Sequence, residues 1–253
     1  MSWYISIISG LIQGLTEFLP VSSSGHLVIL HHFFKIPESR LEFDIFLHLG
    51  TLGSIIFVFY KDIIRILTTD IRTFGFLIIA TIPAVILAIF FDKQIEATFS
   101  QLKFVGFGLL ITALFLIVGS LAEKFSRKDR KKINFLDAIL VGVSQALALF
   151  PGISRSGLTI STALTNGLSK EEAVKFSFLL AILAISGACI FKIKIFNFAN
   201  LGYSPLNIIL GTITAFIVGI LAIKIVLKVI LAQKWYFFAI YCAFVGSLIL
   251  IIF

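Results

Sequence analysis

Two similar polar turns interrupt long hydrophobic stretches of the sequence, Pro20-Val-Ser-Ser-Ser-Gly25 and Pro151-Gly-Ile-Ser-Arg-Ser-Gly157. The first turn divides the apolar region 3–34, and the second divides the apolar region 133–168. Within a membrane, backbone groups that a broken helix leaves unpaired are tolerated only where they are buried in protein or line a cavity. Each region is therefore predicted to form two half-helices that meet at a re-entrant turn.

The composition indicates a membrane protein. Of the 253 residues, 59% are hydrophobic and only 13% are charged, with a mean hydropathy of +1.08, whereas soluble domains carry about 25% charged residues. A helix needs roughly 20 apolar residues to cross a bilayer. Six continuous stretches approach this length: 43–60, 74–91, 104–122, 173–191, 206–226 and 235–253. We therefore expect an all-α polytopic membrane protein with six transmembrane helices and two re-entrant half-helix pairs.

The two interrupted regions resemble each other at an offset of 132 residues. We expect one membrane domain, 1–253, in which repeat 1 covers about 1–122, a cytoplasmic loop covers 123–132 and repeat 2 covers about 133–253. Because each repeat contains three spans, the second copy is predicted to be inverted, so that the two turns approach each other from opposite faces. The matched pairs include Gly10 and Gly142, Gln13 and Gln145, Ser22 and Ser154, Ser24 and Ser156, and Gly25 and Gly157.

Positive charge is distributed unequally among the loops. When alternate loops are assigned to the cytoplasm, that side carries fourteen of the 21 Lys and Arg residues and the other side six, which leaves Arg155 inside a turn. The positive-inside rule then places both termini outside. Topology explains the net charge of +8, so we expect no nucleic-acid partner. Trp235 and Tyr236 are expected to anchor the chain in an interfacial aromatic belt.

Three ionisable residues, Glu17, His26 and Arg155, lie well inside the interrupted regions. A charged group at the centre of a membrane helix costs about 2.5 to 3.5 kcal/mol, so each needs a partner or a function. One explanation is a structural pair between Glu17 and Arg155. The other is a reaction site, because Arg155 lies in a serine-rich turn, and Arg and helix N-termini both bind phosphate.

The candidate site residues follow from these turns. Gln13 and Glu17 share a helix face and could hold a divalent cation, while Ser23 or His26 could attack phosphorus or activate water. For Asp44 and His48, which open the first full span, a supporting contact behind the site and an interfacial position are equally favoured. The candidates for binding the substrate phosphate are Ser22, Ser24, Ser154, Arg155, Ser156 and Thr159.

The motifs Gln13-Gly-Leu-Thr-Glu17-Phe-Leu-Pro-Val-Ser-Ser-Ser-Gly-His26 and Pro151-Gly-Ile-Ser-Arg155-Ser-Gly-Leu-Thr159 resemble the two signature motifs of the undecaprenyl-diphosphatases, the bacitracin-resistance membrane phosphatase family. The resemblance extends over the whole chain. It implies removal of the terminal phosphate of undecaprenyl diphosphate at the outer face of the cell membrane. This reaction recycles the lipid carrier for cell-wall synthesis and confers bacitracin resistance.

The resemblance also implies a divalent cation, Mg²⁺ or Ca²⁺. It assigns catalysis to four residues, Glu17, Ser23, His26 and Arg155. Two positions depart from the family pattern: Gln13 stands where many relatives have Glu, and Leu183 stands where the family usually has Pro. Membrane lipids and a second copy of the chain are further expected partners. The alternative function is a polyprenyl-phosphate flippase or secondary transporter, because such proteins also use inverted repeats with broken helices.

Membrane topology can be tested by cysteine labelling. A cysteine placed in the loop 123–132 should react only with membrane-permeant reagents, because the positive-inside rule puts this loop in the cytoplasm. A cysteine near Asn197 should react with impermeant reagents added outside whole cells. Labelling in the reverse pattern would overturn the predicted orientation.

Overall fold

The structure is a computed structural model that describes residues 2–36, 43–125, 129–193 and 204–253. These residues form ten α-helices. Arg127, Lys128 and Asn197, which enter the topology prediction, lie outside the described residues. Five helices are long and apolar enough to cross a membrane, which confirms an all-α polytopic membrane protein. They are α3 (Phe43–Thr68), α4 (Ile71–Phe99), α5 (Leu102–Phe125), α8 (Lys170–Ile193) and α9 (Pro205–Leu231).

The sixth predicted span, 235–253, is the 17-residue helix α10 (Tyr236–Ile252). At about 1.5 Å per residue it is slightly short for a bilayer core of about 30 Å. Four helices are much shorter, with 14, 11, 13 and 11 residues. Their breaks fall where the sequence predicts them, at the two serine turns. These helices are α1 (Trp3–Thr16), α2 (Ser23–Phe33), α6 (Phe135–Leu147) and α7 (Arg155–Thr165).

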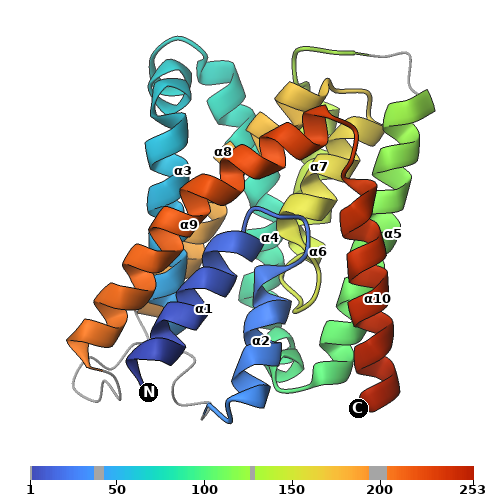
Figure 1. The fold of residues 1–253 in the computed structure, drawn as a ribbon. Coiled ribbons are helices and arrows are strands. Elements are labelled where there is room, and N and C mark those ends of the chain that lie inside the picture. The colour runs from blue at the N-terminus through green and yellow to red at the C-terminus, as the bar shows by residue number, and fades with distance from the viewer. Residues whose placement is uncertain (1, 37–42, 126–128, 194–203) are drawn as a thin grey trace.

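Each short pair reverses direction inside the molecule (Figure 1). The α1–α2 turn and the α6–α7 turn lie at intermediate height, and the two pairs enter from opposite ends. Both chain termini lie at the end from which α1 enters. This arrangement brings two turns that are far apart in sequence into the interior of the bundle.

Small residues allow the short helices to pack closely on long ones. α1 packs against α9, and α6 packs against α4. A side chain on Gly10 would place its Cβ 2.5 Å from the Gly211 carbonyl oxygen, and one on Gly142 would place it 2.7 Å from the Ala80 carbonyl oxygen. Gly10 and Gly142 are also partners in the sequence repeat, so both copies use the same close backbone approach.

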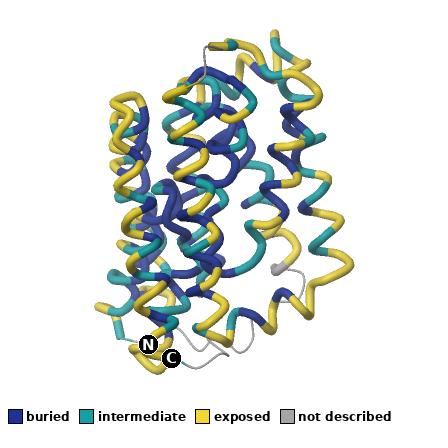
Figure 2. The backbone as a smooth tube through the Cα atoms, turned by 90° about the vertical axis from the view of Figure 1, so that its right-hand side faces the viewer, coloured by how far each residue is buried: buried dark blue, intermediate teal, exposed yellow. Residues whose placement is uncertain are grey.

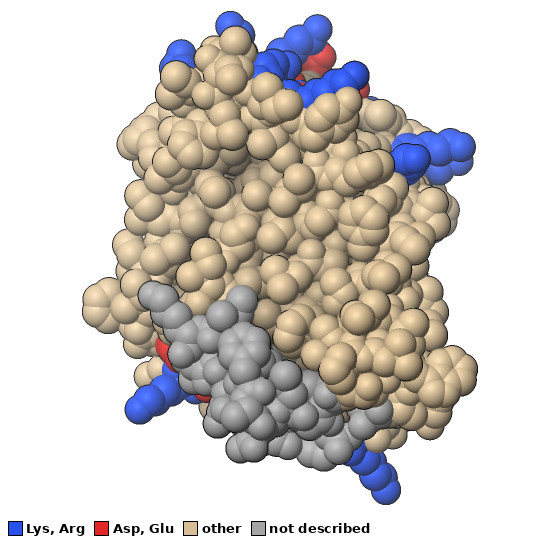
Figure 3. Space-filling model, turned by 90° about the vertical axis from the view of Figure 1, so that its left-hand side faces the viewer, with Lys and Arg blue, Asp and Glu red and all other residues tan. Residues whose placement is uncertain are grey.

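The outer surface is apolar. Leucine, isoleucine and phenylalanine side chains are exposed along the outer faces of the long helices, while the buried positions face inward (Figure 2). On the face shown in Figure 3, a wide uncharged belt separates Lys and Arg side chains at the two ends of the molecule. This distribution suits contact with lipid between two aqueous faces.

The expected belt position of Trp235 is wrong. The Trp235 side chain is fully buried, and its Nε1 donates a hydrogen bond to Glu123 Oε2 at 2.8 Å. Lys170 Nζ lies 3.0 Å from the other oxygen of Glu123. A buried indole N–H needs an acceptor, and Glu123 supplies it because α5 continues to Phe125.

An ion pair also precedes the second short pair of helices. The pKa of Arg130 is raised, chiefly by its hydrogen bonds to the Asp137 carboxylate.

Candidate active site

The two serine turns begin their second half-helices in the same way. In each, a serine hydroxyl accepts a hydrogen bond from the backbone N–H three residues later and lies close to a second serine hydroxyl. Both turns therefore present helix N-termini to the interior, where an anion is favoured. The distances are 3.3 Å for Ser22 and Gly25, 3.1 Å for Ser154 and Gly157, 3.2 Å for Ser22 and Ser24, and 3.3 Å for Ser154 and Ser156.

The turns pack directly against each other. A Cβ on Gly25 would lie 2.9 Å from Gly152 Cα, and Ser156 Oγ donates to the Leu19 carbonyl oxygen at 3.3 Å. Gly152 itself has a φ of +86°, a conformation that L side chains rarely adopt. The close approach of the two repeats thus depends on glycine at this contact.

A buried ion pair joins the two turns. Arg155 Nη2 donates to Glu17 Oε1 at 2.7 Å, and the side chains are only 13% and 7% exposed. The other oxygen, Glu17 Oε2, accepts hydrogen bonds from Ser23 Oγ at 2.6 Å and from Gln13 Nε2 at 3.0 Å. Arg155 also donates from Nη1 to the Ser177 carbonyl oxygen at 3.3 Å. The carboxylate is therefore held between both repeats.

A cavity of about 150 Å³ opens beside this pair. One wall is polar and contains hydroxyl groups, the Glu17 carboxylate and the Arg155 guanidinium. The apolar lining consists of Ala148, Ile153 and three residues of α8, Ala184, Ile185 and Ala188. Donors from two helix N-termini and one guanidinium, next to an apolar wall, suit a phosphate group attached to a hydrocarbon chain. The polar lining consists of Thr16, Glu17, Ser22, Ser23, Ser24, His48, Ser154 and Arg155.

Four of the candidate residues do not line the cavity: Gln13, His26, Ser156 and Thr159. Ser156 and Thr159 are buried, and the Thr159 and Ser177 hydroxyl oxygens lie 2.7 Å apart behind Arg155. His26 turns toward α10, with Nδ1 2.7 Å from the Ser22 carbonyl oxygen and Nε2 2.6 Å from the Tyr241 hydroxyl. These contacts support the two turns.

Several residues of the site escaped prediction from sequence. Thr112 of α5 accepts a hydrogen bond from the Ser154 backbone N–H at 2.9 Å and donates to the Gly152 carbonyl oxygen at 2.9 Å. Neither Thr112 nor Tyr241 carries a sequence signal, since a single polar residue in an apolar helix can face any direction. His48 carried a weak signal, its spacing of four from Asp44.

The chain matches known proteins over its whole length. The family model described as "Bacitracin resistance protein BacA" matches residues 6–248. The chain belongs to the BacA family. A protein named undecaprenyl-diphosphatase from Carboxydothermus hydrogenoformans is 43% identical, over 100% of this chain and 98% of that protein. Proteins of the same name from Desulforapulum autotrophicum and Thermosipho africanus are 38% and 40% identical, over 99% and 95% of this chain and 98% and 96% of those proteins. The family membership inferred from the two motifs is confirmed.

The donor atoms in this BacA-family chain fit a hard cation. Gln13 Oε1 is buried and has no hydrogen-bond partner among the described residues, and it belongs to the same side chain that donates to Glu17. In the described part of the chain, no three His, Cys, Asp or Glu side chains gather as a metal site. Mg²⁺ commonly uses one or two protein oxygens together with water and substrate phosphates, and Gln13 Oε1 and the Glu17 carboxylate are oxygens of this kind.

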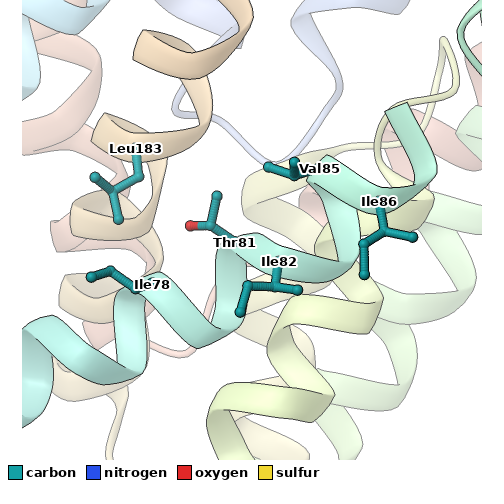
Figure 4. A pocket seen from close by; sticks show the side chains of 6 residues that line it. All are labelled: Ile78, Thr81, Ile82, Val85, Ile86 and Leu183. Carbon is teal, nitrogen blue, oxygen red and sulfur yellow. The ribbon is translucent and has the colours of Figure 1, made fainter. Parts of the chain in front are cut away.

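A second cavity, of about 340 Å³, lies between α4 and α8 and is almost entirely apolar. Figure 4 shows Leu183 of α8 facing Ile78 and Thr81 of α4. Leu183 is the neighbour in sequence of Ala184, which lines the polar cavity. The remaining lining residues are Ile82, Val85 and Ile86.

Thr112 can be tested with an isosteric substitution. Thr112→Val keeps the shape but leaves the buried Ser154 N–H and Gly152 carbonyl oxygen without this partner. We expect a loss of about 1 to 3 kcal/mol in stability, measured as a lower melting temperature in detergent. Thr112→Ser keeps the hydroxyl and serves as the control. An unchanged melting temperature in the Val variant would show that the second turn does not depend on Thr112.

Proposed function

We propose that this chain removes the terminal phosphate of undecaprenyl diphosphate, giving undecaprenyl phosphate and inorganic phosphate. The observation that carries the proposal is the hydrogen bond between Ser23 and Glu17, in a cavity that also contains Arg155 and two helix N-termini. A hydroxyl bonded to a carboxylate is an activated nucleophile, and the other groups bind the phosphate it attacks. The names of the relatives agree with this chemistry.

The residues divide the reaction between them. Ser23 Oγ attacks the terminal phosphorus while its proton passes to Glu17 Oε2, and undecaprenyl phosphate leaves as the phosphorus–oxygen bond breaks. Glu17 then gives this proton to the departing undecaprenyl phosphate. Water next hydrolyses the phosphoserine: Glu17 accepts the proton of water and returns it to Ser23 Oγ as the bond between phosphorus and Ser23 breaks and inorganic phosphate is released. Arg155 and the N–H groups at the start of α2 and α7 stabilise negative charge on the phosphoryl oxygens. His26, held by Ser22 and Tyr241, fixes the turn that carries Ser23.

We also propose a membrane topology for the chain. We take α3, α4, α5, α8, α9 and α10 as six transmembrane helices, and the two short-helix pairs as re-entrant segments of two inverted repeats in one membrane domain. The matched serine caps of the two turns support the repeat. The positive-inside distribution supports an outward position of the termini, and we propose that the active site opens to the same, outer face of the cell membrane. A homodimer is part of the proposal, through apolar surface left exposed on one chain.

A divalent cation, Mg²⁺ or Ca²⁺, is proposed at Gln13 and Glu17. When bound, it would neutralise charge on the diphosphate. Gln13 supplies a neutral amide oxygen where a second carboxylate would bind the cation more strongly. Ser23 Oγ lies 2.6 Å from Glu17 Oε2, so the carboxylate that would hold the cation is also the one that contacts the proposed nucleophile.

The prenyl chain is proposed to lie in the apolar cavity between α4 and α8. The two cavities are lined by neighbouring residues of α8, Leu183 on the apolar side and Ala184 on the polar side. In this proposal a lipid with its diphosphate beside Arg155 extends its first isoprene units along α8 toward Leu183. This path lets the substrate remain in the membrane while its headgroup reaches the catalytic residues.

The function is tested by phosphate release from farnesyl and undecaprenyl diphosphates, using purified protein in detergent. We expect one phosphate per diphosphate, loss of activity after chelation and recovery with added Mg²⁺ or Ca²⁺. Full activity after exhaustive chelation would remove the cation from the proposal. If no phosphate is released but labelled lipid crosses the bilayer in proteoliposomes, the transporter alternative is correct instead.

Arg155→Lys tests the role of the guanidinium. Lys keeps the charge but loses the planar pair of donors, so we expect kcat to fall by a factor that corresponds to about 2 to 3 kcal/mol, as when one preorganised donor is removed. Arg155→Ala should lower both the activity and the melting temperature, because it leaves the buried Glu17 carboxylate without the guanidinium that neutralises it. A stable Lys variant with normal turnover would make Arg155 a purely structural partner of Glu17.

Ile82→Trp tests the position of the prenyl chain. The larger side chain should fill the α4–α8 cavity and raise KM for undecaprenyl diphosphate about tenfold, the effect of losing the burial of about two methylene groups. Ile213→Trp, on the exposed face of α9, is the control. An equal effect of the two variants would place the chain elsewhere.

A further inference from the structure

His48 is the one histidine that lines the polar cavity, in the part of the chain that the structure describes. It lies near the start of α3, on the same helix face as Asp44 and Thr51. The mechanism above gives it no role. Its side chain is 30% exposed, which leaves a path from the ring to whatever occupies the cavity.

Hydrogen bonding fixes the orientation of the His48 ring. Nδ1 lies 2.8 Å from the Asp44 carbonyl oxygen, and because a carbonyl only accepts, Nδ1 is the donor in this contact. The other ring nitrogen, Nε2, lies on the side of Glu17, which lines the cavity together with His48. Its charged neighbour is Glu17 Oε2 at 3.8 Å, which is too far for a hydrogen bond. Nε2 has no hydrogen bond among the described residues, so it remains available for a ligand.

The helix that carries His48 is held firmly against the site. Thr51 Oγ1 donates to the His48 carbonyl oxygen at 3.0 Å and lies 3.5 Å from Gln13 Nε2. At Gly50 the backbone of α3 approaches the Thr212 carbonyl oxygen of α9 so closely that a side chain would not fit. These contacts give the ring a fixed place beside the carboxylate, as expected of a functional group on a rigid element.

The other histidines are differently occupied. Both ring nitrogens of His26 have partners, Ser22 and Tyr241. His31 Nε2 lies 3.4 Å from Asp44, and His32 is exposed, with its ring against Phe253. His48 therefore differs from His26, the histidine of the sequence motif, in having a ring nitrogen available at the cavity.

We infer that His48 is a further catalytic residue, which contacts the terminal phosphoryl group through Nε2. The inference rests on the proposed function and extends it. Arg155 is bonded to Oε1 of Glu17, while His48 lies beside Oε2, the oxygen that also accepts from Ser23. The phosphoryl group attacked by Ser23 would thus lie between guanidinium and imidazole, each approaching a different oxygen of the transferred group.

Substitution gives the first test. His48→Ala should lower kcat/KM for farnesyl diphosphate roughly 10- to 100-fold, the contribution of one hydrogen bond to a charged group, and should weaken inhibition by inorganic phosphate. The melting temperature should not change. His48→Gln, which keeps an amide near the position of Nε2, should retain more activity than Ala and serves if the Ala variant folds poorly. His32→Gln is the control and should match the unmodified protein.

Chemical labelling gives a second test that does not depend on turnover. Diethyl pyrocarbonate acylates imidazole nitrogens that are free, and the modified residues can be identified by mass spectrometry. Inorganic pyrophosphate with Mg²⁺ should protect His48 while leaving His32 fully reactive. Equal labelling of His48 with and without pyrophosphate, together with normal kinetics of the Ala and Gln variants, would overturn the inference. Absence of phosphate release by the unmodified protein would instead overturn the proposed function, and the protection of His48 would still be measurable.

Discussion

The fold depends on one buried contact, the 2.7 Å ion pair between Glu17 and Arg155. The two residues are 138 positions apart and come from different copies of the repeat. Either charge alone would be costly at this depth, since removing one partner of a buried pair typically destabilises by about 3 to 5 kcal/mol. The pair forms only when both turns reach the same place, so it fixes how the two halves of the molecule fit together.

The groups that stabilise this contact are also those that bind anions. Each turn leaves backbone N–H groups at the start of a half-helix, and each caps them in part with one serine, Ser22 or Ser154. The first N–H groups of a helix have no acceptor within that helix, and Ser23, Ser24 and Arg155, in the first turns of α2 and α7, line the cavity. A phosphate bound there, as we propose, would accept hydrogen bonds from these groups. Stability and function converge on the same atoms here, which explains why the turns interrupt helices that would otherwise be continuous.

Sequence patterns were sufficient for the class of protein and for the turns. Apolar length identified the long helices, and the placement of Pro, Gly and Ser identified the breaks, because both effects are local. The partners of side chains could not be predicted in this way. Tryptophan is a residue type that often anchors a chain at the membrane interface, but Trp235 is buried against Glu123. Thr112 resembles any other polar residue of an apolar helix. His26 was assigned from its neighbours in sequence, whereas the histidine beside Glu17 is His48, on another helix. Such contacts depend on how helices pack, which a single sequence does not record.

The same packing favours hydrolysis over transport. Alternating access requires two repeats that separate and rejoin as the binding site opens to each face in turn. Here the repeats are joined at the site itself by the ion pair, by the backbone contact of Gly25 with Gly152 and by the bond from Ser156 to Leu19. Separating them would expose two charges and break close contacts that only glycine permits. A rigid site has the opposite advantage, because donors that are already in position stabilise a transition state without the cost of reorganisation. Groups fixed in this manner are suited to holding a phosphoryl group in place for a nucleophile, the role proposed for Ser23.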